Sequence, residues 1–332
     1  MADYKGIKGF KVQSLASDPT LVEGQVWYNT TGNALKYLAG LGAGSWASGG
    51  AVNSPRNQLG GAGRSQTAGL IMGGIPAPTP GVAGKLTESY DGTSWTEVND
   101  LNTADSYFPG TGSQTAALKT GGSPGGDPTL LTITETFDGT SWTETADLLT
   151  GRYGLTVTGT TTAALAVGGR APGSSALTES WNGTSWSEVN DLNTARHYIA
   201  SATSGTPTAG LVMGGLNPSP PSGGLALTES YNGTSWTEVA DLGTGRYGGG
   251  GTGTEAGALF FGGSTPTKPN TESWDGTSWT EVADLTYGRY NTGFGGIATN
   301  AFIATGDSVP TGGHPTSEEW TQSLTVKTVT VS

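Results

Sequence analysis

A thirteen-residue stretch at positions 177–189 constrains the fold more than any other feature of the chain. It reads Leu-Thr-Glu-Ser-Trp-Asn-Gly-Thr-Ser-Trp-Ser-Glu-Val, and variants recur at 86–98, 133–145, 227–239 and, in shorter form, 270–282. Asn-Gly or Asp-Gly between two alternating segments predicts a β-hairpin with a two-residue type I′ turn. In that register Trp181 faces Thr184, and Glu179 and Trp186 share one face with Trp181. A single hairpin is marginally stable in water, so the copies must stack on one another.

The spacing of the copies indicates how they stack. Tryptophans that mark the repeat are 49, 47, 44, 50 and 43 residues apart, at Trp46, Trp95, Trp142, Trp186, Trp236 and Trp279. Each unit also carries a Gly- and Thr-rich segment, such as 153–160, and an apolar segment ending in paired glycines, such as 163–169. Four strand-like segments in about 40–50 residues are typical of a β-propeller blade.

The order of markers within a unit resembles the kelch repeat. Ten residues after each tryptophan stands a second marker, at Arg56, Asp105, Arg152, Arg196, Arg246 and Arg289. A hydrophobic run into Gly-Gly, an aromatic residue and the tryptophan follow, from about Arg56 to the C-terminus. The resemblance implies a kelch-like, all-β propeller. Three departures stand out: Asp105 replaces Arg, Gly306-Asp307 replaces Gly-Gly, and Leu324 occupies the place of the last tryptophan.

The number of blades follows from the length of the chain. Six units begin at Arg56, and four strand-like runs at 10–14, 25–29, 35–38 and 45–48 suggest a divergent seventh. Division of 332 residues by seven gives about 47 per blade, which matches the period. We therefore expect seven four-stranded blades, with six blades plus an N-terminal arm as the alternative. On this basis residues 1–48 form a divergent blade or a virion-attachment segment, and residues 49–332 form the repeat propeller.

A second resemblance lies near the N-terminus. The run Glu-Gly-Gln-Val-Trp-Tyr-Asn-Thr-Thr-Gly-Asn-Ala-Leu-Lys-Tyr-Leu at 23–38 is similar to a short β-segment found near the start of tail-fibre-like proteins of tailed phages. Arrays of nearly identical kelch-like units resemble structural proteins of marine phages. These resemblances imply a virion protein that is made in the host cytoplasm and carried on the extracellular particle.

Composition excludes several classes of function. The formal net charge is −12, so binding of nucleic acid through a basic face is not expected. The chain has no cysteine, which rules out disulfides, thiolate metal sites and cysteine nucleophiles. No apolar run approaches about 18 residues, so we expect no membrane insertion. The start, Met-Ala-Asp-Tyr-Lys-Gly, lacks the apolar core of a signal peptide.

Two sets of repeated residues are predicted to be structural. One arginine and one glutamate recur in the units, the glutamates at Glu88, Glu135, Glu179, Glu229, Glu272 and Glu318. A carboxylate packed between blades needs a partner, so we expect Arg–Glu pairing; a ring of arginines that binds acidic sugars is the alternative. The hairpin tryptophans recur at one phase in every unit, which favours interblade core over a sugar-stacking surface.

Candidate ligand-binding residues are the aromatic side chains just after the arginine marker, because the loops of a rigid scaffold often carry function. They are Tyr107, Tyr153, His197, Tyr198, Tyr247 and Tyr290. In propellers this loop shares a face with the loop after Gly-Gly. Those second loops are the most variable segments of the chain, at 75–85, 123–129, 170–175, 216–224, 264–269 and 308–315. Recognition and tolerated drift both account for this variability.

Little in the sequence supports catalysis. Neither His197 nor His314 has a metal-ligand companion nearby, and no unique carboxylate pair stands out, so no catalytic residue, metal or cofactor is expected. The prediction is a non-enzymatic structural protein of a bacteriophage virion, as a tail fibre, a tip or a head decoration. It would contact other virion proteins, host-surface glycans or both, as a homo-oligomer or within a symmetric assembly. The alternatives are a polysaccharide-active enzyme and an intracellular kelch adaptor that binds proteins.

Overall fold

The computed structural model describes residues 13–17, 26–77, 81–125, 129–217, 223–264, 266–308 and 314–328. The regular elements among these residues are all strands, and no helix in this part of the chain is long and apolar enough to cross a membrane. The chain divides into two compact units. One comprises Ser45–Thr321, and the other combines Met1–Gly44 with Gln322–Ser332.

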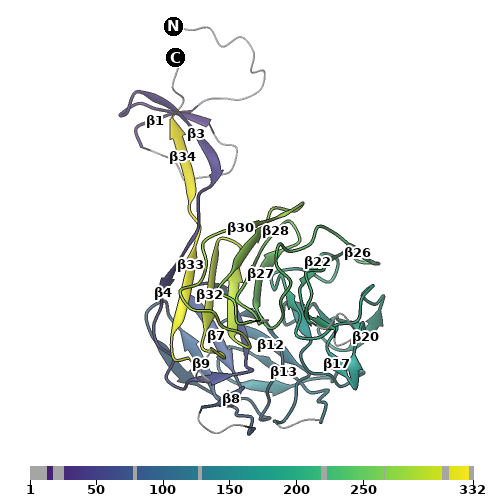
Figure 1. The fold of residues 1–332 in the computed structure, drawn as a ribbon. Helices are drawn as coiled ribbons and strands as arrows, with labels where there is room; N and C mark the ends of the chain where they lie inside the picture. Colours follow the sequence, from purple (N-terminus) through teal and green to yellow (C-terminus); the bar gives the residue numbers. More distant parts are fainter. Residues whose placement is uncertain are drawn as a thin grey trace. The chain divides into compact units, whose positions relative to one another are not determined.

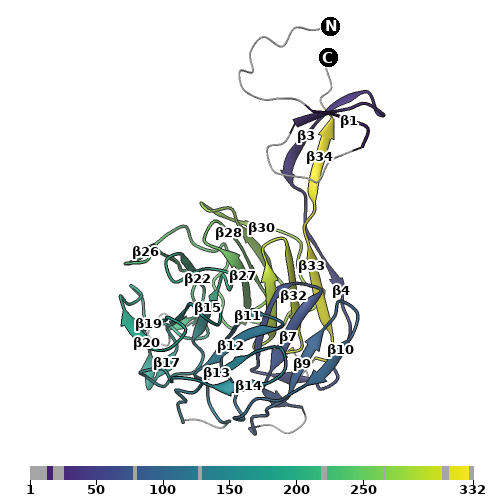
Figure 2. The ribbon, with the colours of Figure 1, turned by 180° about the vertical axis from the view of Figure 1, so that it is seen from behind.

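The unit formed by Ser45–Thr321 is a β-propeller (Figures 1 and 2). Within its described residues it contains six four-stranded antiparallel sheets, which we number as blades 1 to 6 along the chain. From the innermost strand outward, blades 1 to 3 are β6 (Gly60–Ser65), β7 (Ala68–Met72), β9 (Thr87–Tyr90) and β10 (Trp95–Val98); β11 (Gly110–Ser113), β12 (Ala116–Thr120), β13 (Thr134–Phe137) and β14 (Trp142–Glu144); and β15 (Thr156–Gly159), β16 (Ala164–Val167), β19 (Thr178–Trp181) and β20 (Trp186–Val189).

Blades 4 to 6 repeat this plan. Their strands are β21 (Ala200–Ser201), β22 (Gly210–Met213), β25 (Thr228–Tyr231) and β26 (Trp236–Glu238); β27 (Gly250–Thr254), β28 (Gly257–Phe261), β29 (Thr271–Trp274) and β30 (Trp279–Glu281); and β31 (Gly293–Ile297), β32 (Asn300–Ala304), β33 (Ser317–Thr321) and β4 (Ser45–Ser48). Three two-stranded ribbons lie outside the blades: β5 (Arg56–Asn57) with β8 (Ile75–Pro76), β17 (Arg170–Ala171) with β18 (Gly173–Ser174), and β23 (Leu216–Asn217) with β24 (Gly223–Gly224).

The expectation of a seventh blade is wrong, because the N-terminal strand closes the sixth. Strand β4 supplies the outermost strand of blade 6, where Trp46 lies opposite Trp320 of β33. Trp46 thus fills the place that the sequence analysis assigned to Leu324, which belongs to the other unit. The predicted boundary at residue 48 separates this strand from the blade that it completes.

The second unit is a sheet built from both ends of the chain. Its strands, in order, are β1 (Gln13–Leu15), β2 (Val26–Asn29), β3 (Ala34–Leu41) and β34 (Leu324–Thr328). Trp27 of β2 is fully buried within it. The described part of the phage-like run at 23–38 therefore forms the β2–β3 hairpin, while residues 23–25 and the start of the expected strand at 10–14 lie outside the described residues.

The blade hairpins differ in register from the sequence prediction. In blade 3, Trp181 pairs with Trp186 and Glu179 pairs with Glu188, so the turn spans four residues instead of two. The Oδ1 atom of Asn182 accepts hydrogen bonds from the backbone N–H groups of Thr184 and Ser185, both at 2.9 Å. This side-chain bond favours the wider turn. Because the pairing register shifts by two residues, Glu179, Trp181 and Trp186 still lie on one face of the hairpin, as predicted.

Two rings of backbone hydrogen bonds close the propeller around its axis. At the residue two positions after each arginine marker, the N–H group donates to the equivalent carbonyl of the preceding blade, at 2.6–2.9 Å. This inner ring comprises Gln58, Tyr107, Gly154, Tyr198, Gly248 and Asn291, all with φ between 52° and 68°. A second ring lies further out. In each blade the backbone N–H of the second glycine of the Gly-Gly pair, or of Gly306 in blade 6, donates to the backbone carbonyl of the arginine marker, or of Asp105, in the next blade, at 2.8–3.0 Å. Each ring has six members in the described chain, one from each blade.

Glycine lets the innermost strands approach one another closely. A Cβ atom on Gly61 of β6 would lie 2.3 Å from the backbone nitrogen of Phe294 in β31. A Cβ atom on Gly110 of β11 would lie 2.5 Å from the carbonyl oxygen of Gly61. Side chains at these positions would separate the blades, so glycine at these inner-strand positions reflects backbone-to-backbone packing.

Candidate functional site

The repeated arginines form buried ion pairs inside the blades. Each of the five arginine markers is fully buried and contacts the glutamate on the third strand of its own blade. The pairs are Arg56–Glu88, Arg152–Glu179 (3.0 Å), Arg196–Glu229 (3.0 Å), Arg246–Glu272 (2.5 Å) and Arg289–Glu318 (2.6 Å). The structure therefore brings the two predicted sets together away from solvent, where they cannot form an open anion site.

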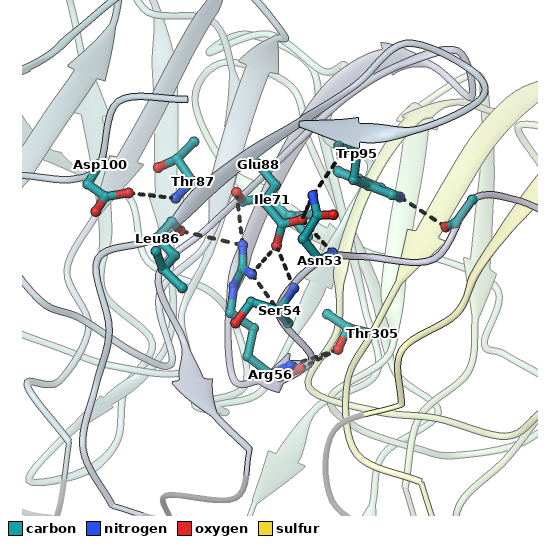
Figure 3. Close-up of polar contacts among 11 residues, drawn as sticks. Asn53, Ser54, Arg56, Ile71, Leu86, Thr87, Glu88, Trp95, Asp100 and Thr305 are labelled. Carbon is teal, nitrogen blue, oxygen red and sulfur yellow. Dashed lines mark hydrogen bonds and ion pairs between the residues drawn. The ribbon is translucent and has the colours of Figure 1, made fainter. Parts of the chain in front are cut away.

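Figure 3 shows this network in blade 1. The guanidinium of Arg56 contacts Glu88 and donates to the backbone carbonyl of Ser54 at 2.9 Å. The other carboxylate oxygen of Glu88 accepts bonds from the backbone and side chain of Asn53, at 2.8 and 3.0 Å. Burial lowers the pKa of Arg56, and the charge of Glu88 opposes that shift. Because its bonds satisfy the buried carboxylate, the network ties the loop before the inner strand to the third strand.

Blade 2 contains a reversed arrangement. Asp105 stands at the arginine position, and Lys119 of β12 extends its ammonium to 2.6 Å from Asp105 and 3.9 Å from Glu135. All three side chains are fully buried. Burial raises the pKa of Asp105 to about 7, against the opposing charge and hydrogen bond of Lys119. Lys119 was missed by sequence reasoning, although the charge reversal at Asp105 could have prompted a search for it.

The hairpin tryptophans lie in the core between blades. The rings of Trp181 and Trp186 are 5.3 Å apart and pack with Leu118 of the preceding blade. In four blades the outer tryptophan donates its indole N–H to a threonine hydroxyl of the preceding blade. The pairs are Trp46–Thr271, Trp186–Thr134, Trp236–Thr178 and Trp279–Thr228, at 3.0–3.2 Å. Trp95 instead donates to the carbonyl of Gly50 at 3.2 Å.

Two adjoining cavities form a funnel at one end of the propeller axis. The narrower cavity, of about 70 Å³, is lined by all six members of the inner hydrogen-bonded ring. The wider cavity, of about 410 Å³, is lined by Gln58, Ile75, Gly81, Tyr107, Ser123, Tyr153, Arg170 and Tyr198. We call the funnel the two cavities, their lining residues and Asp307, which lines neither cavity but accepts a hydrogen bond from the lining residue Asn291. It joins the residues after the arginine marker to the variable loops after Gly-Gly.

The predicted aromatic residues belong to two concentric series. Tyr107 and Tyr198 are members of the inner ring, two positions after the marker, while the other four lie one position after it. The centroids of Tyr107 and Tyr153 are 5.7 Å apart, and those of Tyr107 and Tyr198 are 5.5 Å apart. Tyr198 also packs against His197 and Tyr247, at 4.8 and 5.9 Å. Five of the six candidates therefore form one aromatic cluster.

Glycines in the inner ring make room for this cluster. A Cβ atom on Gly154 would lie 2.9 Å from the ring of Tyr198. Tyr107 and Tyr198 themselves adopt positive φ values of 56° and 52°, which are uncommon for residues other than glycine. The closed backbone ring holds them in this conformation, so the tyrosines are oriented before any ligand arrives.

The opposite side of the funnel is polar. Asp307 accepts hydrogen bonds from the side-chain amides of Asn57, at 2.5 Å, and Asn291, at 3.1 Å. Burial raises the pKa of Asp307, while the two amides oppose the shift. Tyr290 completes this side through two backbone hydrogen bonds with Asp307. Sequence reasoning missed Asn57, Gln58 and Asn291 as candidates, because they interrupt the aromatic pattern after the arginine marker. It also missed Arg170, which lies in one of the variable loops.

Blade 6 also requires a correction to the repeat alignment. Thr305 and Gly306, with φ of 52° and 101°, adopt the conformations that the paired glycines have elsewhere. The hydroxyl of Thr305 donates to the carbonyl of Arg56 at 2.6 Å, and this contact compensates for the strained backbone. Asp307 is therefore the first residue after the pair, equivalent to Arg170 in blade 3.

The histidines have structural partners. Nδ1 of His197 lies 2.9 Å from the hydroxyl of Ser174, and burial lowers the pKa of His197 to about 4. His314 bonds Thr316 through Nδ1 at 2.7 Å. The described residues hold no group of three His, Asp or Glu side chains placed to bind a metal ion. Parts of five predicted variable loops lie outside the described chain: residues 78–80, 126–128, 218–222, 265 and 309–313.

Comparisons with known proteins bear on the fold. No protein-family model matches the chain, and no curated protein matches its sequence. Among solved structures, that of YjhT, a kelch-type β-propeller, aligns with a TM-score of 0.63 and 12% sequence identity, over 84% of this chain and 99% of that one. At this identity the likeness concerns the fold alone, and it identifies the chain as an all-β propeller.

Proposed function

We propose that the protein is a non-enzymatic, saccharide-binding propeller of a phage virion, which contacts host-surface glycans through the funnel. The observation that carries this proposal is the aromatic cluster of Tyr107, Tyr153 and Tyr198 in the wall of a cavity of about 410 Å³. That volume falls within the range of about 300–1,000 Å³ that is usual for small-molecule sites. Tyrosine rings present an apolar face with a hydroxyl at one end, a combination that suits the ring of a sugar.

Rigidity of the site supports binding of a ligand. Tyr107 and Tyr198 are anchored in the closed backbone ring, so little conformational entropy is lost when a ligand stacks on them. The amides of Asn57 and Asn291 and the carboxylate of Asp307 add hydrogen-bonding groups beside the cluster.

The residues around the funnel favour binding over hydrolysis. Glycoside hydrolysis ordinarily uses two carboxyl groups that flank one bond. Neither cavity is lined by Asp or Glu among the described residues, and Asp307 is held by two asparagine amides. An attachment role, in which the ligand is held and left unchanged, accounts for this arrangement.

The virion setting extends the resemblance of the 23–38 run to tail-fibre-like proteins. In this proposal the sheet made from both chain ends joins the propeller to other virion proteins, and copies of the chain assemble symmetrically. Mass spectrometry of purified phage particles tests this part directly. Absence of the protein from particles whose genome encodes it would contradict the virion setting and would leave the proposal of saccharide binding in place.

Saccharide binding is tested with a glycan array and the complete protein. Tyr198→Ala should abolish binding, while Tyr37→Ala, which removes an exposed tyrosine of the other unit, should leave it unchanged. Tyr37→Ala should melt close to the wild-type temperature. Tyr198→Ala loses the ring packing of the cluster and should melt at a lower temperature, so binding is measured where melting shows that it is folded. Equal binding by the two variants, or release of reducing ends from a bound polysaccharide, would overturn the proposal.

A further inference from the structure

The funnel carries opposite charges on opposite sides. Arg170 and Asp307 occupy equivalent positions in blades 3 and 6, each paired with the residue one position after the arginine marker. Because these blades are three apart in a ring of six, the two side chains originate on opposite sides of the axis. The remaining equivalent positions hold uncharged residues: Ile75, Ser123, Leu216 and Ser264.

The guanidinium of Arg170 lies at the wall of the wider cavity, 5.8 Å from the ring centre of Tyr153. Within the described chain it forms no ion pair, whereas all five arginine markers do. Its positive charge acts together with burial to lower the pKa of His197. Arg170 is thus a cation in the funnel that the framework leaves available, and a guanidinium binds carboxylate or phosphate through two hydrogen bonds.

Asp307 provides a negative charge on the opposite side of the axis from Arg170. The carboxylate is half-buried and receives one amide hydrogen bond on each oxygen, and no cation of the described residues pairs with it. Each oxygen retains capacity to accept another hydrogen bond. Tyr107 is close to both sides: it packs against Tyr153, which Arg170 contacts, and its pKa is raised by burial and by the charge of Asp307.

We propose, on the basis of the function proposed above, that the funnel selects a saccharide unit with an anionic group at one end and hydroxyl or amine donors at the other. The carboxylate or phosphate of this unit binds Arg170, the donors bind Asp307, and the sugar ring lies over the tyrosines between them. An uncharged sugar would leave Arg170 without a partner, and an anion without donors would leave Asp307 without one.

The test uses four small saccharides and the complete protein, with affinities measured by ligand-observed NMR. Glucose is the uncharged reference, glucuronate and glucose 6-phosphate distinguish the two sources of anionic charge, and glucosamine 6-phosphate adds an amine. At least one of the two anions should bind about tenfold more tightly than glucose, as expected for one charge-assisted hydrogen bond. The amine should strengthen binding of the phosphate further.

Two variants assign these preferences to residues. Arg170→Gln should remove the preference for the anions, and Asp307→Asn should remove the gain from the amine. Lys85→Gln and Glu188→Gln change the same charges at exposed residues outside both cavities and should preserve both preferences. Thermal melting of each variant checks that it is folded. The saccharide preferences of the wild type are measured without any variant, so they test the proposal even where a variant does not fold.

The outcomes separate the two proposals. Binding of glucose as tightly as the anions, or an anion preference that survives Arg170→Gln, would overturn the charge assignment and leave saccharide binding in place. Failure of all four saccharides and of the glycan array to bind would overturn the proposed function, and the charge assignment with it.

Discussion

Blade 2 and the other five blades differ in the residue that supplies the positive charge next to a buried glutamate. In all six, a glutamate of the third strand is buried and needs a positive charge. Five blades supply it from the loop before the inner strand, through arginine, whereas blade 2 supplies it from β12, through Lys119. Equivalent positions in the other blades hold apolar residues, such as Ile71 and Val212, opposite the glutamate. The comparison indicates that the framework requires a buried charge pair, and that the residue supplying the cation can change.

The two solutions differ in charge balance. An Arg–Glu pair is neutral, whereas blade 2 buries two carboxyl groups around one ammonium group. Burial of Asp105 raises its pKa, against the opposing charge and hydrogen bond of Lys119. Removal of the single ammonium group should therefore destabilise blade 2 more than removal of one arginine destabilises another blade.

Substitution of Lys119 should have the largest effect. Lys119→Met leaves two buried carboxyl groups without a cation, and we expect a loss of about 5 kcal/mol in the free energy of unfolding. Urea unfolding at neutral pH measures it. The double variant Asp105→Arg with Lys119→Ile rebuilds the arrangement of blade 1 and should recover most of the loss. A double variant no more stable than Lys119→Met would show that the blades are not interchangeable.

Substitution of Arg152 in a standard blade should have a somewhat smaller effect, because a single carboxylate loses its partner. We expect Arg152→Met to lower the free energy of unfolding by about 3–4 kcal/mol. The same variant should bind saccharides with wild-type affinity under conditions where it is folded. Unchanged melting combined with lost binding would reverse the assignment of the arginines to the framework.

The charge balance of blade 2 also predicts a dependence on pH. The pKa of Asp105 is about 7 in the folded protein, above its ordinary value of 3.8. The stability contributed by the protonated carboxyl is thus fully present below about pH 4 and is lost as the pH rises through 7, on the order of 4 kcal/mol in all. Unfolding of the wild type and of the Asp105→Arg, Lys119→Ile double variant between pH 4 and 8 isolates this component. Identical pH profiles would contradict the prediction.

The smallest expected difference concerns hydrogen bonds between blades. The indole N–H of Trp186 is bonded to Thr134, whereas the indole N–H of Trp142 and the hydroxyl of Thr87 have no partner within the described structure. Trp186→Phe should therefore cost about 1 kcal/mol more than Trp142→Phe, the usual net value of one hydrogen bond. Chemical unfolding of the two variants side by side checks this. A larger cost for Trp142→Phe would show that ring packing and not the hydrogen bond decides the difference.

Much of the propeller was predictable from the sequence because its repeats are nearly identical. The alternation around Trp181 correctly placed Glu179, Trp181 and Trp186 on one face of the hairpin, whereas the register depended on a side-chain bond from Asn182 that dipeptide rules do not include. The number of blades depended on a pairing between residues 46 and 320, for which local sequence holds little signal. The absence of a tryptophan at Leu324, together with an early one at Trp46, was the available indication.

The candidate site was predictable in outline only. Aromatic residues near the arginine marker were identified, but their division into two series required the backbone ring. Arg170 and Asp307 gave no signal as a pair, because 137 positions separate them in the chain and only the symmetry of the ring relates them. Their equivalence also depended on the conformation of Thr305, which takes a position normally held by glycine.

The most direct test of the account is to locate a bound saccharide, by a crystal structure of the complex or by NMR chemical-shift mapping. The account predicts contacts with Tyr107, Tyr198, Arg170 and Asp307 in the funnel, with the buried Arg–Glu pairs unchanged. A saccharide bound on the outer strands of the blades, or one that inserts between the members of an Arg–Glu pair, would contradict the division between framework and binding site.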